Sequence, residues 1–177
     1  MTNTRDKLNE AKHFLEEMKR FSPQTDAFRY TFTAFLSALR SITLVMQKEF
    51  SNASDFSEWY ANKQTVMENH SVLKYLHRQR NLTHHERPVL IYPIGVAEQR
   101  VTENNRITYT LTGTGDTLNL NPVFSVPCPQ YAESVEVKYY FSDFTDRTKY
   151  VMTICQEAIT TLEEIVAECE AGFIPAA

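Results

Sequence analysis

The residues of this sequence that are best suited to chemistry lie between positions 69 and 87. The window from Lys74 to Arg87 carries four basic residues against one acidic residue, whereas the 177-residue chain as a whole has a net charge of −4. Three of the chain's five histidines also lie in this window, namely His77, His84 and His85. Local positive charge in an acidic chain favours contact with an anion such as a phosphate.

The spacing of these residues matters if the window is helical, because residues four apart then share a face. His77, Asn81 and His85 form one row, and Arg80 and His84 form a second row about 100° away. An arginine offers a fixed fork of donors to phosphate oxygens, and a histidine exchanges a proton near neutral pH. Together with an amide that orients them, these groups suffice to cleave RNA without a metal.

The segment Arg80-Asn81-Leu82-Thr83-His84-His85 resembles the Arg-Asn-x-x-x-His motif of HEPN domains. The stretch from Phe28 to Arg40 is similar to the long second helix of such proteins, and the resemblance covers residues 4–87 and 143–172. It implies a bundle of four to five helices. It also implies metal-independent cleavage of single-stranded RNA, with the motif assembled across a homodimer interface, in a toxin–antitoxin or phage-defence setting with an antitoxin or another protein partner.

Carried over to this chain, the resemblance implies that Arg80 and His85 are catalytic and that Asn81 is their polar helper. The surrounding residues expected to bind RNA are Lys74, His77, Arg78, His84 and Arg87. Some HEPN domains lack activity, so a non-catalytic binding or dimerisation module for RNA, a nucleotide or a protein partner is the alternative. A third interpretation is a structural subunit, because cations at a helix C-terminus stabilise it by about 0.3–1 kcal/mol each.

A metal site is not expected in this window. His70, His77 and His84 recur every seven residues, which is roughly 10.5 Å along a helix. Zinc–nitrogen bonds are about 2.0–2.1 Å long, so one ion cannot bridge successive members of the row. The sequence therefore predicts neither a metal nor a cofactor.

Apolar residues that recur at three- and four-residue steps predict the helices that carry this window. The predicted helices cover residues 4–21, 26–50, 56–69 and 71–84, and a last helix begins after Asp143 and ends at Gly172. Pro23 cannot donate a hydrogen bond within a helix, so it ends the first one. Pro88 sets the outer limit of the fourth.

Residues 88–141 have a different character, with five prolines and alternating apolar residues. Ile107–Leu111 and Val135–Phe141 alternate as strands do, and a turn at Asn104-Asn105 would pair the first of them with 94–102. We expect three or four antiparallel strands. The predicted fold is therefore one α-rich (α+β) domain over residues 1–177, with a helical bundle at 4–87 and 143–172 and a β insertion at 88–141 before the last helix.

Composition limits the setting of the protein. No run of 18 apolar residues occurs, which predicts the absence of a membrane span. The three cysteines, Cys128, Cys155 and Cys169, show no Cys-x-x-Cys spacing and are interpreted as reduced thiols. The sequence thus favours a cytoplasmic chain.

Overall fold

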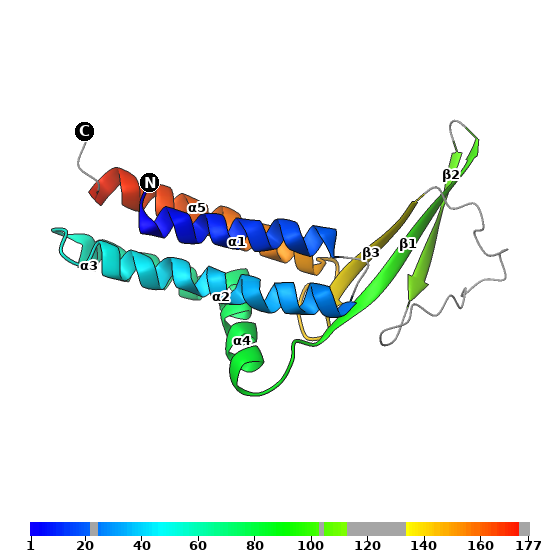
Figure 1. The fold of residues 1–177 in the computed structure, drawn as a ribbon, viewed down its shortest axis with the longest axis horizontal. Helices are drawn as coiled ribbons and strands as arrows, with labels where there is room; N and C mark the ends of the chain where they lie inside the picture. The colour runs from blue at the N-terminus through cyan, green and yellow to red at the C-terminus, as the bar shows by residue number, and fades with distance from the viewer. Residues whose placement is uncertain (22–24, 103–104, 113–133, 174–177) are drawn as a thin grey trace.

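The computed structural model describes residues 1–21, 25–102, 105–112 and 134–173. In this part of the chain it has five α-helices and a small antiparallel sheet placed before the last helix, so the predicted α-rich fold class is confirmed (Figure 1). The elements are α1 Asn3–Arg20, α2 Thr25–Glu49, α3 Phe56–Asn69, α4 Ser71–His85, β1 Ile91–Thr102, β2 Asn105–Thr112, β3 Ser134–Phe141 and α5 Val151–Phe173.

The long helices α1, α2 and α5 run side by side, and α4 crosses beneath α2 (Figure 1). Each long helix buries one apolar stripe. In α1 the stripe consists of Leu8, Ala11, Leu15 and Met18, which recur at the three- and four-residue steps of a helix face. The stripes of α2 and α5 meet it in a single core of buried residues. The burial of this apolar surface is the main force that holds the bundle together.

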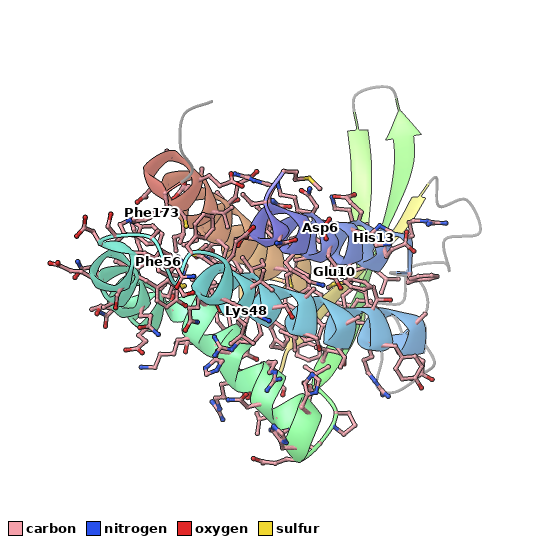
Figure 2. All side chains as sticks on the ribbon, turned by 60° about the vertical axis from the view of Figure 1, so that its left-hand side comes forward. Asp6, Glu10, His13, Lys48, Phe56 and Phe173 are labelled. Carbon is pink, nitrogen blue, oxygen red and sulfur yellow. The ribbon has the colours of Figure 1, made fainter. Side chains whose placement is uncertain are left out.

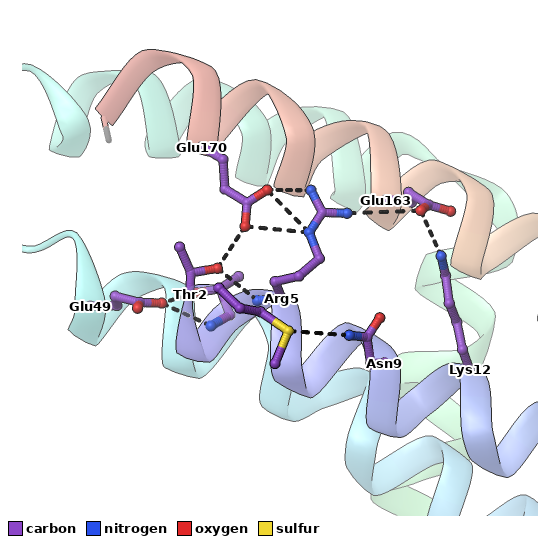
Figure 3. Close-up of polar contacts among 9 residues, drawn as sticks. Thr2, Arg5, Asn9, Lys12, Glu49, Glu163 and Glu170 are labelled. Carbon is purple, nitrogen blue, oxygen red and sulfur yellow. Dashed lines mark hydrogen bonds and ion pairs between the residues drawn. The ribbon is translucent and has the colours of Figure 1, made fainter. Parts of the chain in front are cut away.

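Polar contacts hold the start of α1 between α2 and α5 (Figure 3). Thr2 caps α1 by accepting a hydrogen bond from the backbone N–H of Arg5 at 3.0 Å. The guanidinium of Arg5 pairs with Glu170 of α5, while Glu49 of α2 accepts from the backbone N–H of Thr4 at 2.8 Å. These contacts therefore join residues that are far apart in the sequence and fix the relative position of three helices.

One residue joins α3 to α4. His70 ends α3 and is also the N-cap of α4, where its Nδ1 accepts from the backbone N–H of Leu73 at 3.5 Å. Ser71, a residue type that often caps helices, is not the cap here, because it is already the first residue of the helix. The imidazole nitrogen performs the capping that a serine hydroxyl usually provides.

Asp143, which follows β3, attaches the middle of α4 to the end of the sheet. Its carboxylate accepts a 2.6 Å hydrogen bond from the hydroxyl of Tyr75 and two 3.3 Å bonds from the side-chain amide of Gln79. Burial, with the neighbouring Asp143 carboxylate, raises the pKa of Tyr75 far above its usual value. The tyrosine therefore stays a neutral donor.

The sheet has the strand order β2-β1-β3, with both pairs antiparallel. Alternate residues of β3 face the helices, where Tyr139 stacks on Phe28 with ring centroids 3.9 Å apart and Phe141 lies 5.5 Å from Phe32. The rest of the sheet extends away from that end of the bundle (Figure 1). Of the predicted turn, Asn104 lies outside the described residues and Asn105 is the first residue of β2.

The last helix continues one residue beyond its predicted end, because Gly172 lies inside α5 and Phe173 closes it. The ring of Phe173 packs edge-on against Phe56 at 5.3 Å and against Trp59 at 5.4 Å, at the end of the bundle (Figure 2). These aromatic contacts stabilise a further helical residue after the glycine. None of the helices in the described part of the chain is long and apolar enough to cross a membrane.

Candidate functional site

Helix α4 positions the residues that the sequence singles out. Buried Val72, Leu73, Tyr75, Leu76 and Gln79 anchor one side of the helix in the bundle. On the remaining surface, the structure places six of the predicted site residues as exposed and two, Arg80 and Arg87, as half-buried. The exposed residues are Lys74, His77, Arg78, Asn81, His84 and His85. Helix α4 therefore presents cationic and imidazole side chains on its surface outside the core.

Arg80 and Asn81 are brought together. The Nη1 of Arg80 donates to the Oδ1 of Asn81 at 3.3 Å, which fixes the plane of the guanidinium. The Nε of Arg80 is buried, and within the described residues it has no hydrogen-bond partner. Buried polar groups almost always have a partner, so this nitrogen marks a place where an acceptor is missing.

His84 is held by the neighbouring helix. Its Nε2 lies 2.9 Å from the Oγ of Ser37 on α2, and the same Oγ lies 3.1 Å from the backbone oxygen of Thr33. A serine hydroxyl has a single proton. Both contacts are satisfied when that proton is donated to Thr33 and the Oγ accepts the Nε2–H of His84. The neutral imidazole then carries its free lone pair on Nδ1.

His85 lies apart from Arg80. It is the last residue of α4, and among the described residues its side chain contacts neither Arg80 nor Asn81. Five residues along a helix correspond to a rotation of about 140°, so the two side chains leave different faces. Its nearest functional neighbour is His84, with ring centroids 6.4 Å apart. One chain thus forms an Arg80–Asn81 pair and, about one turn later, a pair of imidazoles.

The other predicted site residues fall into two groups. Lys74 and His77 line a cavity together with Arg80. Arg78 points instead toward Asp143, with Nη2 4.0 Å from its carboxylate, and Arg87 follows the helix, its backbone N–H donating to the oxygen of Leu82 at 2.9 Å. The first group is therefore better placed to bind a ligand.

The cavity lies between α2, α3 and α4 and has a volume of about 470 Å³. Its cations are Arg40, Lys74 and Arg80, and its acid is Glu68. Arg40 donates from Nη1 to the hydroxyl of Thr43 at 3.0 Å. The remaining lining residues are Leu36, Leu39, Thr43, Tyr60, Gln64, Met67, Leu73, Leu76, His77 and Leu162. The cavity therefore combines a cationic part with an apolar wall.

Sequence reasoning missed Arg40 as a site residue, although a signal was present. Arg40 is the only charged residue between positions 30 and 47, the apolar and neutral middle of the helix. A lone cation in such a stretch indicates a specific partner or site, because an unpaired charge is costly to bury. In the fold, Arg40 lines the same cavity as Arg80 of α4.

Comparison with protein-family models matches the first half of the chain. Residues 1–87 match a family model described as bacteriophage lambda protein ea47. No curated protein and no solved structure matches the chain. The matched segment contains α1 to α4 and ends at Arg87, so every predicted site residue, and every lining residue of the cavity except Leu162, lies within the matched part of the chain.

Proposed function

We propose that this protein is a HEPN-like, metal-independent endoribonuclease that cleaves single-stranded RNA at the surface of α4. The observation that carries the proposal is the hydrogen bond between His84 and Ser37, which leaves Nδ1 of the imidazole free one helical turn from Arg80. A positioned base beside a guanidinium is what cleavage of a phosphodiester without a metal requires.

The proposed reaction is an internal transfer at phosphorus. Nδ1 of His84 takes the proton of the ribose 2′-hydroxyl, whose oxygen then bonds to the adjacent phosphorus. The bond from phosphorus to the 5′-oxygen breaks, and protonated His85 gives its proton to that oxygen. Arg80, oriented by Asn81, stabilises the negative charge on the phosphate. The products are a 2′,3′-cyclic phosphate and a 5′-hydroxyl, and no water or metal is consumed.

The biological setting is part of the same proposal. We place the protein in phage defence or in a toxin–antitoxin pair, with an antitoxin as protein partner; the match to a bacteriophage protein family supports a phage-related setting and no more specific role. The buried free thiols of Cys155 and Cys169 support a reducing, cytoplasmic compartment. We propose a homodimer that apposes two copies of α4. A light-scattering mass equal to the 20.5 kDa of one chain would contradict the dimer.

The test of function uses the purified chain, excess EDTA and an unstructured RNA. We expect the wild type to cleave, and His84→Ala, His85→Ala and Arg80→Ala each to lower the rate by about a hundredfold or more. His13→Ala is the matched control, because His13 is exposed on α1 beside Phe14 and lies outside the site. The proposal would be contradicted if His13→Ala lost as much cleavage activity as the three site variants. It would also be contradicted if the site variants cleaved RNA as fast as the wild type.

A binding module is the second candidate, and one observation favours it. Arg80 lines the cavity, whereas His85 is exposed at the helix end and does not line it, so one chain does not bring them together. This function predicts RNA binding that is weakened by Arg80→Ala and unchanged by His85→Ala, with intact RNA recovered after incubation. Cleavage that depends on His85 excludes it.

A further inference from the structure

We propose that the cavity between α2, α3 and α4 binds the phosphate monoester of a small organic ligand, with Arg80 and Arg40 as the anion-binding residues. This site goes beyond RNA cleavage and does not depend on it, since a chain without nuclease activity would still bind the ligand. Three features of the cavity support the proposal.

The first feature is a free terminal donor of Arg80. Its Nη1 is engaged by Asn81, and its Nε is closed to solvent, so an anion in the cavity does not reach Nε. Its Nη2 has no hydrogen-bond partner within the described residues and is not closed to solvent. An oxyanion in the cavity would accept a charge-assisted hydrogen bond from Nη2. Arg80 therefore has a charged donor to offer to a bound anion.

The second feature is the charge of the lining. Arg40, Lys74 and Arg80 contribute three positive charges, and Glu68 contributes one negative charge, which leaves a net charge of +2. A phosphate monoester carries a charge of about −1.5 to −2 near pH 7 and has three strong acceptor oxygens. A phosphodiester or a single carboxylate carries only one negative charge. Charge complementarity therefore favours the monoester.

The third feature is the shape and polarity of the cavity. Its volume of about 470 Å³ lies within the roughly 300–1,000 Å³ that is usual for small-molecule sites. The apolar lining includes Leu36, Leu39, Met67 and Leu76. A ligand that fills this space thus carries an apolar or aromatic body next to its phosphate. Either a free small molecule or the 5′-phosphorylated end of an RNA would supply this chemistry.

Isothermal titration of the full chain with phenyl phosphate tests the site. We expect one molecule to bind per chain, at least about tenfold more tightly than phenol, inorganic phosphate or the diester methyl phenyl phosphate. Binding of the diester or of phenol as tightly as the monoester, or no binding of phenyl phosphate, would overturn the proposal. A 5′-phosphorylated oligonucleotide that competes when its 5′-hydroxyl form does not would identify an RNA end as the source.

Variants of two lining residues locate the site. Arg40→Gln should weaken phenyl phosphate binding by roughly tenfold to a hundredfold, because it removes a charge-assisted hydrogen bond. The matched control is Arg29→Gln on the same helix, whose Nη2 lies 3.4 Å from Asp26 and which does not line the cavity. Should Arg40→Gln fail to fold by circular dichroism, Lys74→Gln decides the question, since Lys74 is exposed. Unchanged affinity in the folded variants would contradict the assignment.

Discussion

Single hydrogen bonds determine how the candidate site is oriented. The bond from His84 to Ser37 fixes the tautomer of the imidazole, and the bond from Arg80 to Asn81 fixes the plane of the guanidinium. Neither contact adds much stability on its own, because both lie near the surface. Their effect is to hold a base and an anion-binding group in place on one side of α4.

Removing the hydroxyl of Ser37 tests this positioning. Ser37→Ala should lower the rate of RNA cleavage about two- to tenfold, because His84 loses the acceptor for its Nε2–H. The pH–rate profile should change as well, and Ser37→Thr should restore both. Ser41→Ala is the matched control, since its hydroxyl donates to the backbone oxygen of Ser37 at 2.9 Å and not to the histidine. A rate and profile equal to wild type in Ser37→Ala would show that the contact has no role.

The carboxylate of Asp143 is the corresponding test of stability. In Asp143→Ala the buried hydroxyl of Tyr75 loses its acceptor and Gln79 loses both of its bonds. We expect the free energy of unfolding, measured by urea denaturation, to fall by about 1–3 kcal/mol. Asp146→Ala in the same loop should have a smaller effect, because the side chain of Asp146 bonds only to Thr148, two residues away, and to no other element. Equal losses in the two variants would contradict the role of Asp143.

Two carboxylates, Glu49 of α2 and Glu170 of α5, join these helices to α1, and the pKa of each is shifted by its hydrogen bonds. The hydrogen bond from Arg5 lowers the pKa of Glu170. Burial tends to raise the pKa of Glu49, but hydrogen bonds from Thr4 and Asn3 together outweigh it, so its pKa is lowered as well. A carboxylate whose pKa is lower in the native state than in the unfolded state stabilises the fold. This stabilisation is complete at a pH above the pKa of the unfolded state, about 4.3 for Glu, and it is lost as the pH falls through the pKa of the native state.

We expect the wild type to lose stability in acid, and we expect Glu170→Gln to show a smaller acid-dependent loss. The variant should be less stable than wild type at pH 7, and its free energy of unfolding should fall less steeply below about pH 5. Glu164→Gln, at an exposed position on the same helix, should follow the wild-type curve. Parallel curves for wild type and Glu170→Gln in chemical denaturation below pH 5 would show that the Arg5 pair does not couple protonation to folding.

Much of the element structure could be predicted from the sequence, because it depends on local periodicity. The helices predicted at 4–21 and 26–50 are found at Asn3–Arg20 and Thr25–Glu49. The differences from the prediction are at helix ends, because contacts between residues distant in the sequence determine where a helix begins and ends. His70, and not a serine or threonine, caps α4, and the packing of Phe173 extends α5 past its glycine. Periodicity contains no information about such contacts.

The candidate site was predictable only in part for the same reason. The cationic window of α4 is local in sequence and was found. The contributions of α2 were not found, because Ser37 and Arg40 meet α4 only after the bundle folds. The four-residue spacing of Arg80 and His84 predicted that they share one face of a helix, and both lie on α4 in the structure. The assignment of catalysis to His85 stays a prediction.

At the scale of the whole molecule, the sheet is a projection anchored to the bundle by its base (Figure 1). The anchoring rings are Tyr139 and Phe141 of β3, which pack on α2. Gly95 of β1 pairs with Val137 of β3, so replacing residues 96–136 by Asn-Gly would close a short hairpin. We expect this shortened chain to keep the helical circular dichroism signal and cooperative unfolding of the full chain. Loss of helicity would show that the bundle needs the projecting part.

The central claim is that α4 cleaves RNA through its own side chains. The most direct measurement is mass spectrometry of the ends produced when the full chain is incubated with single-stranded RNA in excess EDTA. The account predicts fragments with 2′,3′-cyclic phosphate and 5′-hydroxyl ends, absent when His84 and His85 are both replaced by alanine. Intact RNA at high protein concentration, or fragments with 3′-hydroxyl and 5′-phosphate ends, would contradict it.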